Sequence, residues 1–150
     1  MSDIVSVERF IPAPASEIFD LIADPGRHKD IDGSGTVRDA RGDTERLRMG
    51  STFGMSMKMG VPYAMESTVI EFEEDRRLAW QTRGPTFIGK LVGGRVWRYE
   101  LEPGEGGTLV RETWDLTDES PATKWGAKRA EKATAKNMAA TLERIEQLLT

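Results

Sequence analysis

The chain has 150 residues, of which 38% are hydrophobic and 31% are charged, and its formal net charge is −4. This length is enough for one domain with a substantial core, and the composition is not that of a disordered chain. The net charge gives no electrostatic footprint for nucleic acid or an anionic membrane, and the absence of cysteine excludes disulfides and thiolate metal sites.

The first elements are a strand and a short helix. Residues 4–11 alternate as a strand, which Pro12 and Pro14 end because proline lacks a backbone donor. A helix is expected from Ala15, with an apolar stripe, and residues 24–26 (Asp-Pro-Gly) stop it.

The middle of the chain predicts an antiparallel meander. Its apolar residues alternate with polar ones in short segments that are separated by turns rich in Gly, Pro and Asp. The expected strands are residues 36–40, 52–59, 63–73, 77–82, 96–102 and 108–117. Since we find no internal repeat and no linker, we expect one domain over residues 1–150.

The closing segment predicts one long helix over about residues 121–149. Ser120 and Pro121 form a start signal, and the last third carries an apolar stripe at helical spacing. The stripe consists of Met138, Leu142, Ile145 and Leu149. The first half, rich in Ala, Lys and Glu around Trp125, either lies over a more open region such as a pocket mouth or simply approaches the sheet closely.

Large apolar side chains on the expected inner face of the sheet are candidates for ligand binding. An alternating methionine stripe suits a cavity for varied apolar shapes, and the aromatic residues add flat surfaces with a polar tip. The candidate set is Met55, Met57, Trp80, Trp97, Tyr99, Glu112, Trp114 and Met138. The alternative is that these side chains only pack an ordinary core.

Glu112 is the one acidic residue in that set, since alternation places it on the same face as Val110 and Trp114. A buried carboxylate is costly unless it is paired. We expect a structural ion pair with an arginine such as Arg98 or Arg129. The alternative is that Glu112 binds a ligand hydroxyl, or acts as an acid or base after desolvation raises its pKa.

No catalytic or metal-binding motif stands out. We expect the lone histidine, His28, at the surface or at a helix end; a general base or pH-sensitive pocket group is the alternative. One histidine without cysteine cannot form a histidine-rich zinc site, and residues 30–33 match a calcium loop too briefly. The catalytic residues are therefore unknown, and no metal or cofactor is expected.

The glycine-rich segment 84–94 predicts a mobile hairpin that gates the pocket, because glycines lower the cost of changing backbone angles. Its apolar residues Phe87, Ile88 and Leu91 suit an apolar entrance. The alternative is that this hairpin is a contact in a homodimer.

Several segments resemble the SRPBCC superfamily, which includes START domains, the birch-pollen allergen and polyketide cyclase/dehydrase-like proteins. The most specific is residues 8–25, ERFIPAPASEIFDLIADP. Weaker matches are VIEF at 69–72, RLAW at 77–80, WRYEL at 97–101 and GTLVRE at 107–112. The resemblance implies an α+β helix-grip fold: a curved antiparallel sheet of about seven strands, two short helices after the first strand, and a long C-terminal helix.

The resemblance leaves three functions open, because one fold hosts many activities. The favoured one is a carrier or sensor that binds a small hydrophobic ligand (a lipid, isoprenoid or aromatic polyketide) between the sheet and the last helix. The alternatives are a polyketide cyclase/dehydratase-like enzyme and a protein-interaction module. Because we find neither a leader nor an apolar run that could span a bilayer, we expect a cytoplasmic protein without stable membrane insertion or nucleic-acid partners.

Overall fold

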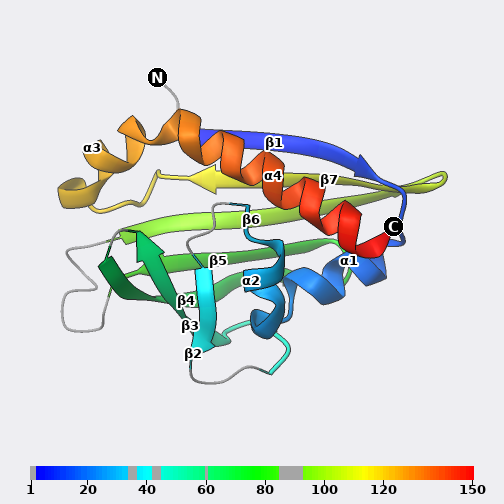
Figure 1. Ribbon diagram of the computed structural model, residues 1–150, viewed down its shortest axis with the longest axis horizontal. Helices are drawn as coiled ribbons and strands as arrows, with labels where there is room; N and C mark the ends of the chain where they lie inside the picture. The colour runs from blue at the N-terminus through cyan, green and yellow to red at the C-terminus, as the bar shows by residue number, and fades with distance from the viewer. Residues whose placement is uncertain (1–2, 34–36, 42–44, 60, 85–92) are drawn as a thin grey trace.

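The computed structural model describes residues 3–33, 37–41, 45–59, 61–84 and 93–150, and within them all side chains except those of 37–41, 55–59 and 61–65. These residues form a seven-stranded antiparallel sheet with helices against one face (Figure 1). The strands are β1 (Ile4–Ile11), β2 (Val37–Arg41), β3 (Thr52–Met59), β4 (Val61–Glu73), β5 (Arg77–Arg83), β6 (Gly93–Gly104) and β7 (Gly107–Asp115). The helices are α1 (Ala15–Ile22), the 3-10 helix η1 (Pro25–Arg27), α2 (His28–Ile31), α3 (Pro121–Arg129) and α4 (Glu131–Leu149).

The sheet confirms the meander and the predicted helix-grip fold. Its strand order is β1-β7-β6-β5-β4-β3-β2, so β2 to β7 pair in chain order and β1 joins the last strand. The register shifts between Val69 and Glu71, where β4 carries a bulge. That bulge leaves both Val69 and Phe72 on the face that packs against the helices.

The helices α4 and α1 cover one face of the sheet, which we call the inner face (Figure 1). The predicted stripe of α4 is confirmed: Met138, Leu142 and Ile145 are buried, and Leu149 packs against the core. From α1, four apolar residues are buried: Ile18, Phe19, Leu21 and Ile22.

The prediction of one continuous closing helix is wrong, because the helix is broken at Ala130. There the φ and ψ angles are −90° and 7°, and the backbone N–H bonds back to the carbonyl of Ala127 at 3.0 Å. Within α3 only Ala127 is buried, so this helix lacks the apolar stripe that holds α4 against the sheet. Figure 1 shows α3 at the end of the sheet, beyond the start of β1. Its Lys124 and Lys128 are held there by Asp3, at 2.9 and 3.0 Å.

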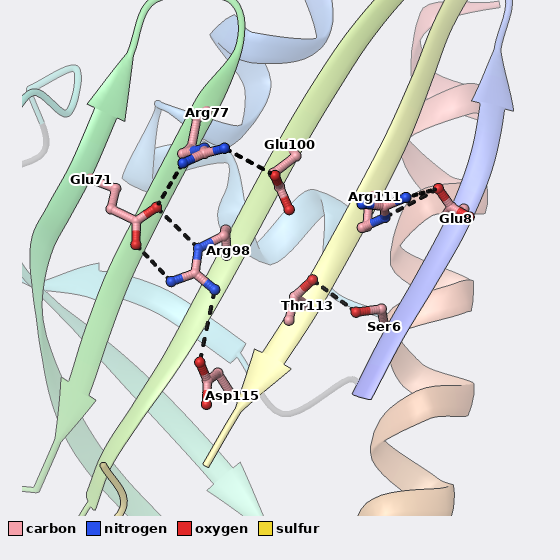
Figure 2. Close-up of polar contacts among 9 residues, drawn as sticks. All are labelled: Ser6, Glu8, Glu71, Arg77, Arg98, Glu100, Arg111, Thr113 and Asp115. Atoms are coloured by element: carbon pink, nitrogen blue, oxygen red, sulfur yellow. Dashed lines mark hydrogen bonds and ion pairs between the residues drawn. The ribbon is translucent and has the colours of Figure 1, made fainter. Parts of the chain in front are cut away.

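The opposite face of the sheet, the outer face, carries a ladder of ion pairs (Figure 2). Arg98 donates two hydrogen bonds to Glu71, at 3.0 and 2.6 Å, and this bonding holds the pKa of Glu71 below its usual value. The bonds join β6 to β4 across β5, where Ala79 between them is fully buried. Further along, Arg77 pairs with Glu100, and Arg111 pairs with Glu8. The polar side chains of this ladder are therefore paired with one another across the strands.

A glycine fixes the connection between α2 and β2 against α4. The Gly33 N–H donates to the Thr141 hydroxyl at 2.9 Å. A Cβ at Gly33 would lie 2.6 Å from the Thr141 nitrogen and 2.7 Å from the Ala140 Cβ, and it would also meet the carbonyl of Asn137. Since these are mainly helix backbone atoms, they cannot move aside cheaply.

We predict that Gly33→Ala lowers the free energy of unfolding by roughly 1–3 kcal/mol, the usual cost of overpacking. Urea denaturation measures this. The matched control is Gly104→Ala, because a Cβ there would meet nothing within 4 Å. Equal stability of the two variants would contradict the close contact.

Candidate functional site

The inner face of β5, β6 and β7 brings together most of the residues singled out from the sequence. In the sheet register, Trp80 lies opposite Trp97, and Trp97 lies opposite Trp114. The next row on the same face pairs Tyr99 with Glu112. Ring centroids are 6.0 Å apart for Trp97–Trp114 and 5.7 Å apart for Trp80–Tyr99. The aromatic residues thus line this face across three strands as two ring pairs, which belong to two separate apolar clusters.

Glu112 lies between two buried apolar clusters. Along β7 it is flanked by Val110, which belongs to the cluster around α1, and by Trp114, which packs with Leu116, Ala127 and Met138. Its side chain is buried, with a residue exposure of 3%. A charged carboxylate is poorly solvated in such surroundings.

The burial of Glu112 raises the pKa of its carboxyl to about 8, and the charge of Asp32 adds to this effect. The hydrogen bond with the Tyr99 hydroxyl acts in the opposite direction and only partly offsets it. Burial, together with Glu112, also raises the pKa of Tyr99 well above its ordinary value. The carboxyl is thus mostly protonated at neutral pH.

Two buried polar atoms on this face have no hydrogen-bond partner within the described part of the chain. They are Oε1 of Glu112 and Nε1 of Trp114. Buried polar groups are nearly always partnered, so each such exception calls for an explanation. The two residues are neighbours on one face of β7, so a carboxyl oxygen and an indole N–H lie on the same face without partners among the described residues.

The prediction that an arginine neutralises Glu112 is wrong for both arginines that we named. Arg98 lies on the outer face, because it is one residue out of phase with Tyr99 along β6, and it binds Glu71. Arg129 lies over the Trp125 ring on α3, 4.7 Å from its centroid. Within the described residues, the hydrogen-bond partner of the Glu112 carboxyl is Tyr99.

His28 lies at a helix end, as expected, but it is buried rather than at the surface. Its ring stacks on Trp80 at 5.1 Å, and its Nε2 donates to the carbonyl of Ile22 at 2.8 Å. Burial lowers the pKa of His28, so the ring is neutral at neutral pH. Sequence reasoning missed Phe53 and Asp32: Phe53 meets the His28 ring edge-on, and Asp32 acts electrostatically on Tyr99 and Glu112.

Part of the predicted site lies outside the described residues. The side chains of Met55 and Met57 are not described, and neither is segment 85–92 of the predicted hairpin. Two surface hollows of about 300 and 360 Å³ lie elsewhere, one on the outer face beside Arg77 and Arg111 and the other along residues 45–52. The pocket between sheet and helix therefore stays a prediction.

The described residues set two further limits. Among them, no three His, Asp or Glu side chains gather closely enough to hold a metal ion. None of their helices combines the length and the apolar character that crossing a membrane requires.

Comparisons with known proteins give a family match and similar folds. The family model described as polyketide cyclase/dehydrase and lipid transport matches residues 3–150. Uncharacterized protein Rv0088 of Mycobacterium tuberculosis is 35% identical over 142 residues, which cover 90% of this chain and 59% of that protein. The chain thus spans less than two thirds of the length of this relative.

Among solved structures, protein CV1439 of Chromobacterium violaceum has a TM-score of 0.75 at 15% identity, with 99% of this chain and 98% of that chain covered. DynU16, from the dynemicin biosynthetic locus, has a TM-score of 0.68 at 15% identity, with 99% of this chain and 48% of that chain covered. Because the sequence identity is so low, these two structures support the fold alone.

We predict that Glu112→Gln changes how stability depends on pH. The folded protein holds the Glu112 proton up to a pKa of about 8, whereas the unfolded chain releases it near the ordinary pKa of 4.5. Unfolding therefore releases a proton between these values, and wild-type stability falls as the pH rises through this window. The glutamine variant lacks this loss. Its free energy of unfolding, relative to that of wild type, should therefore rise by on the order of a few kcal/mol between pH 5 and pH 9.

Urea denaturation across this pH range makes the measurement. The control is Glu102→Gln, which removes an exposed carboxyl from the same sheet and should follow wild type. Parallel wild-type and Glu112→Gln profiles would show that Glu112 ionises normally in the folded protein.

Proposed function

This chain belongs to the polyketide cyclase/dehydrase and lipid transport family within the SRPBCC superfamily, and from that premise we propose that its inner face binds a small hydrophobic molecule carrying an oxygen function. In this proposal the protein is a carrier or sensor, and the ligand is a hydroxylated or carbonyl-bearing lipid, isoprenoid or aromatic polyketide.

The observation that carries the proposal is the unpartnered Oε1 of Glu112. A buried polar atom without a partner destabilises the fold by about 1–3 kcal/mol. Replacing the carboxyl with an apolar side chain would remove this cost. A ligand with an oxygen function would remove it as well, by forming a hydrogen bond with the unpartnered carboxyl oxygen. A protonated carboxyl can donate to a carbonyl oxygen, and its free oxygen can accept from a hydroxyl.

The surroundings of Glu112 define the rest of the ligand. Trp97, Trp114 and Met138 are apolar apart from the two indole nitrogens, of which that of Trp114 is buried without a partner among the described residues. In this proposal the ligand lies at Glu112, between the two apolar clusters. A ligand with an apolar, partly flat body and one or two oxygen groups matches these surroundings.

We predict that the protein binds 2-naphthol more tightly than naphthalene, two probes that differ only in a hydroxyl group. One hydrogen bond to a buried partner is worth up to about 1.5 kcal/mol, or roughly a tenfold ratio of dissociation constants. Glu112→Leu should abolish this preference while naphthalene binding persists. Equilibrium dialysis of both probes measures the ratio.

The matched control is Glu102→Leu, which changes an exposed glutamate on β6 in the same way and should keep the preference. The proposal fails if neither probe binds or if the naphthol preference survives in Glu112→Leu. Circular dichroism of each variant verifies that it is folded. Native mass spectrometry of the purified wild type would then identify a co-purified ligand by its mass.

A second candidate function, a cyclase- or dehydratase-like enzyme, is favoured by one observation. Because the pKa of Glu112 is raised to about 8, its carboxyl keeps a proton that it can give to a carbonyl or leaving hydroxyl near neutral pH. Turnover of a β-hydroxyketone would distinguish the two functions. An enzyme that uses this acid should lose activity as the pH rises past 8 and in Glu112→Gln, whereas a carrier should leave the compound unchanged.

A further inference from the structure

The charge of the chain is unevenly distributed. Residues 121–140, which form α3 and the first half of α4, contain five basic residues and one acidic residue. The remaining 130 residues contain 16 basic and 24 acidic ones. The overall charge of −4 therefore hides a positively charged segment on a negatively charged protein.

An exposed tryptophan lies within this positive segment. Trp125 of α3 is 70% exposed, the largest exposure among the exposed large hydrophobic residues of the described chain. The Arg129 guanidinium covers one side of its ring, at 4.7 Å from the centroid. Leaving a side chain of this size in water forfeits the stabilisation that burial would bring.

Exposed basic residues follow Trp125 in the sequence, on both sides of the break at Ala130. Lys124 and Lys128 are bound to Asp3, whereas Arg129, Lys132 and Lys136 are exposed. We call Trp125, Arg129, Lys132 and Lys136 the basic surface.

We propose that the basic surface docks the protein on an anionic lipid bilayer. Tryptophan favours the boundary between lipid headgroups and acyl chains, and lysine and arginine beside it favour anionic headgroups. Each basic residue close to such a surface contributes a roughly fivefold gain in affinity. The contact is peripheral, since no described helix could cross the membrane.

This inference deepens the proposed function and rests on it, because a carrier whose ligand is a lipid would exchange that ligand with a membrane. The docking contact itself does not involve Glu112. The start of α3 is also connected to the start of β6, since the N–H of Ser120 donates to the carbonyl of Gly93 at 2.7 Å. Docking would therefore bring the membrane to the end of the sheet at which β6 begins.

Vesicle flotation of the intact protein tests the proposal. Wild type should float with mixed phosphatidylcholine–phosphatidylglycerol vesicles but not with pure phosphatidylcholine, and high salt should release it. Lys132→Gln combined with Lys136→Gln should weaken binding at least about tenfold. Trp125→Ala should also weaken vesicle binding. Because the lost contact is apolar, the factor by which binding weakens should change little with salt concentration.

The matched control combines Arg48→Gln with Met49→Ala. These exposed residues lie between β2 and β3, at the opposite edge of the sheet from β1, and the control should bind like wild type. The proposal is overturned if wild type shows no preference for anionic vesicles or if the control weakens binding equally. It is also overturned if Trp125→Ala instead dissociates a dimer in analytical ultracentrifugation.

The 2-naphthol assay contains no membrane, so the two proposals fail separately. Loss of flotation with intact naphthol binding overturns only the docking surface. Flotation without naphthol binding overturns only the proposed ligand site.

Discussion

The pairing register of β5, β6 and β7 is the constraint on which the rest of the structure depends. Successive side chains of a strand point to opposite faces, so a shift by one residue would exchange the two faces completely. In the observed register, Tyr99 lies on the inner face and its neighbour Arg98 lies on the outer face. The aromatic surface and the ion-pair ladder are thus two consequences of one alignment, and the Arg98–Glu71 pair holds that alignment from outside.

Glu112 is the exception on the inner face, and its position explains why it could carry function. Arg9 on the same face is paired with Glu146 of α4, whereas the Glu112 carboxyl lies between two apolar clusters, where it weakens the fold. The Tyr99 hydroxyl satisfies one of its oxygens and leaves the other without a partner within the described residues. A site that is incomplete in this way is suited to a ligand that brings the missing group.

The sequence predicted those features that follow from periodicity. Strand alternation placed Trp80, Trp97 and Trp114 on one face, and the helical stripe identified the side of α4 that packs on the sheet. The order of elements and the resemblance of residues 8–25 led to the helix-grip fold. These features are local, so a single sequence carries them.

Features that depend on tertiary packing were not predictable. The break at Ala130 lies between Arg129 and Glu131, which both favour helix, so helix propensity does not predict it. Alternation put Arg98 one residue out of phase with Tyr99, yet the assignment of Glu112 to an arginine ignored this. The burial of His28 and the effect of Asp32 on the pKa of Glu112 depend on how α2 packs against the sheet. The four residues of α2 do not by themselves predict that packing.

The central claim is that the folded protein keeps a neutral carboxyl on its inner face for a ligand oxygen. The most direct test is isotope-edited infrared spectroscopy of protein labelled with ¹³C at the glutamate carboxyls, recorded across the pH range. We expect a protonated carboxyl band at pH 7 that is absent in Glu112→Gln, titrates near pH 8, and shifts in frequency when 2-naphthol binds. If all glutamates are ionised at pH 7, or if the band does not respond to the bound probe, the claim is contradicted.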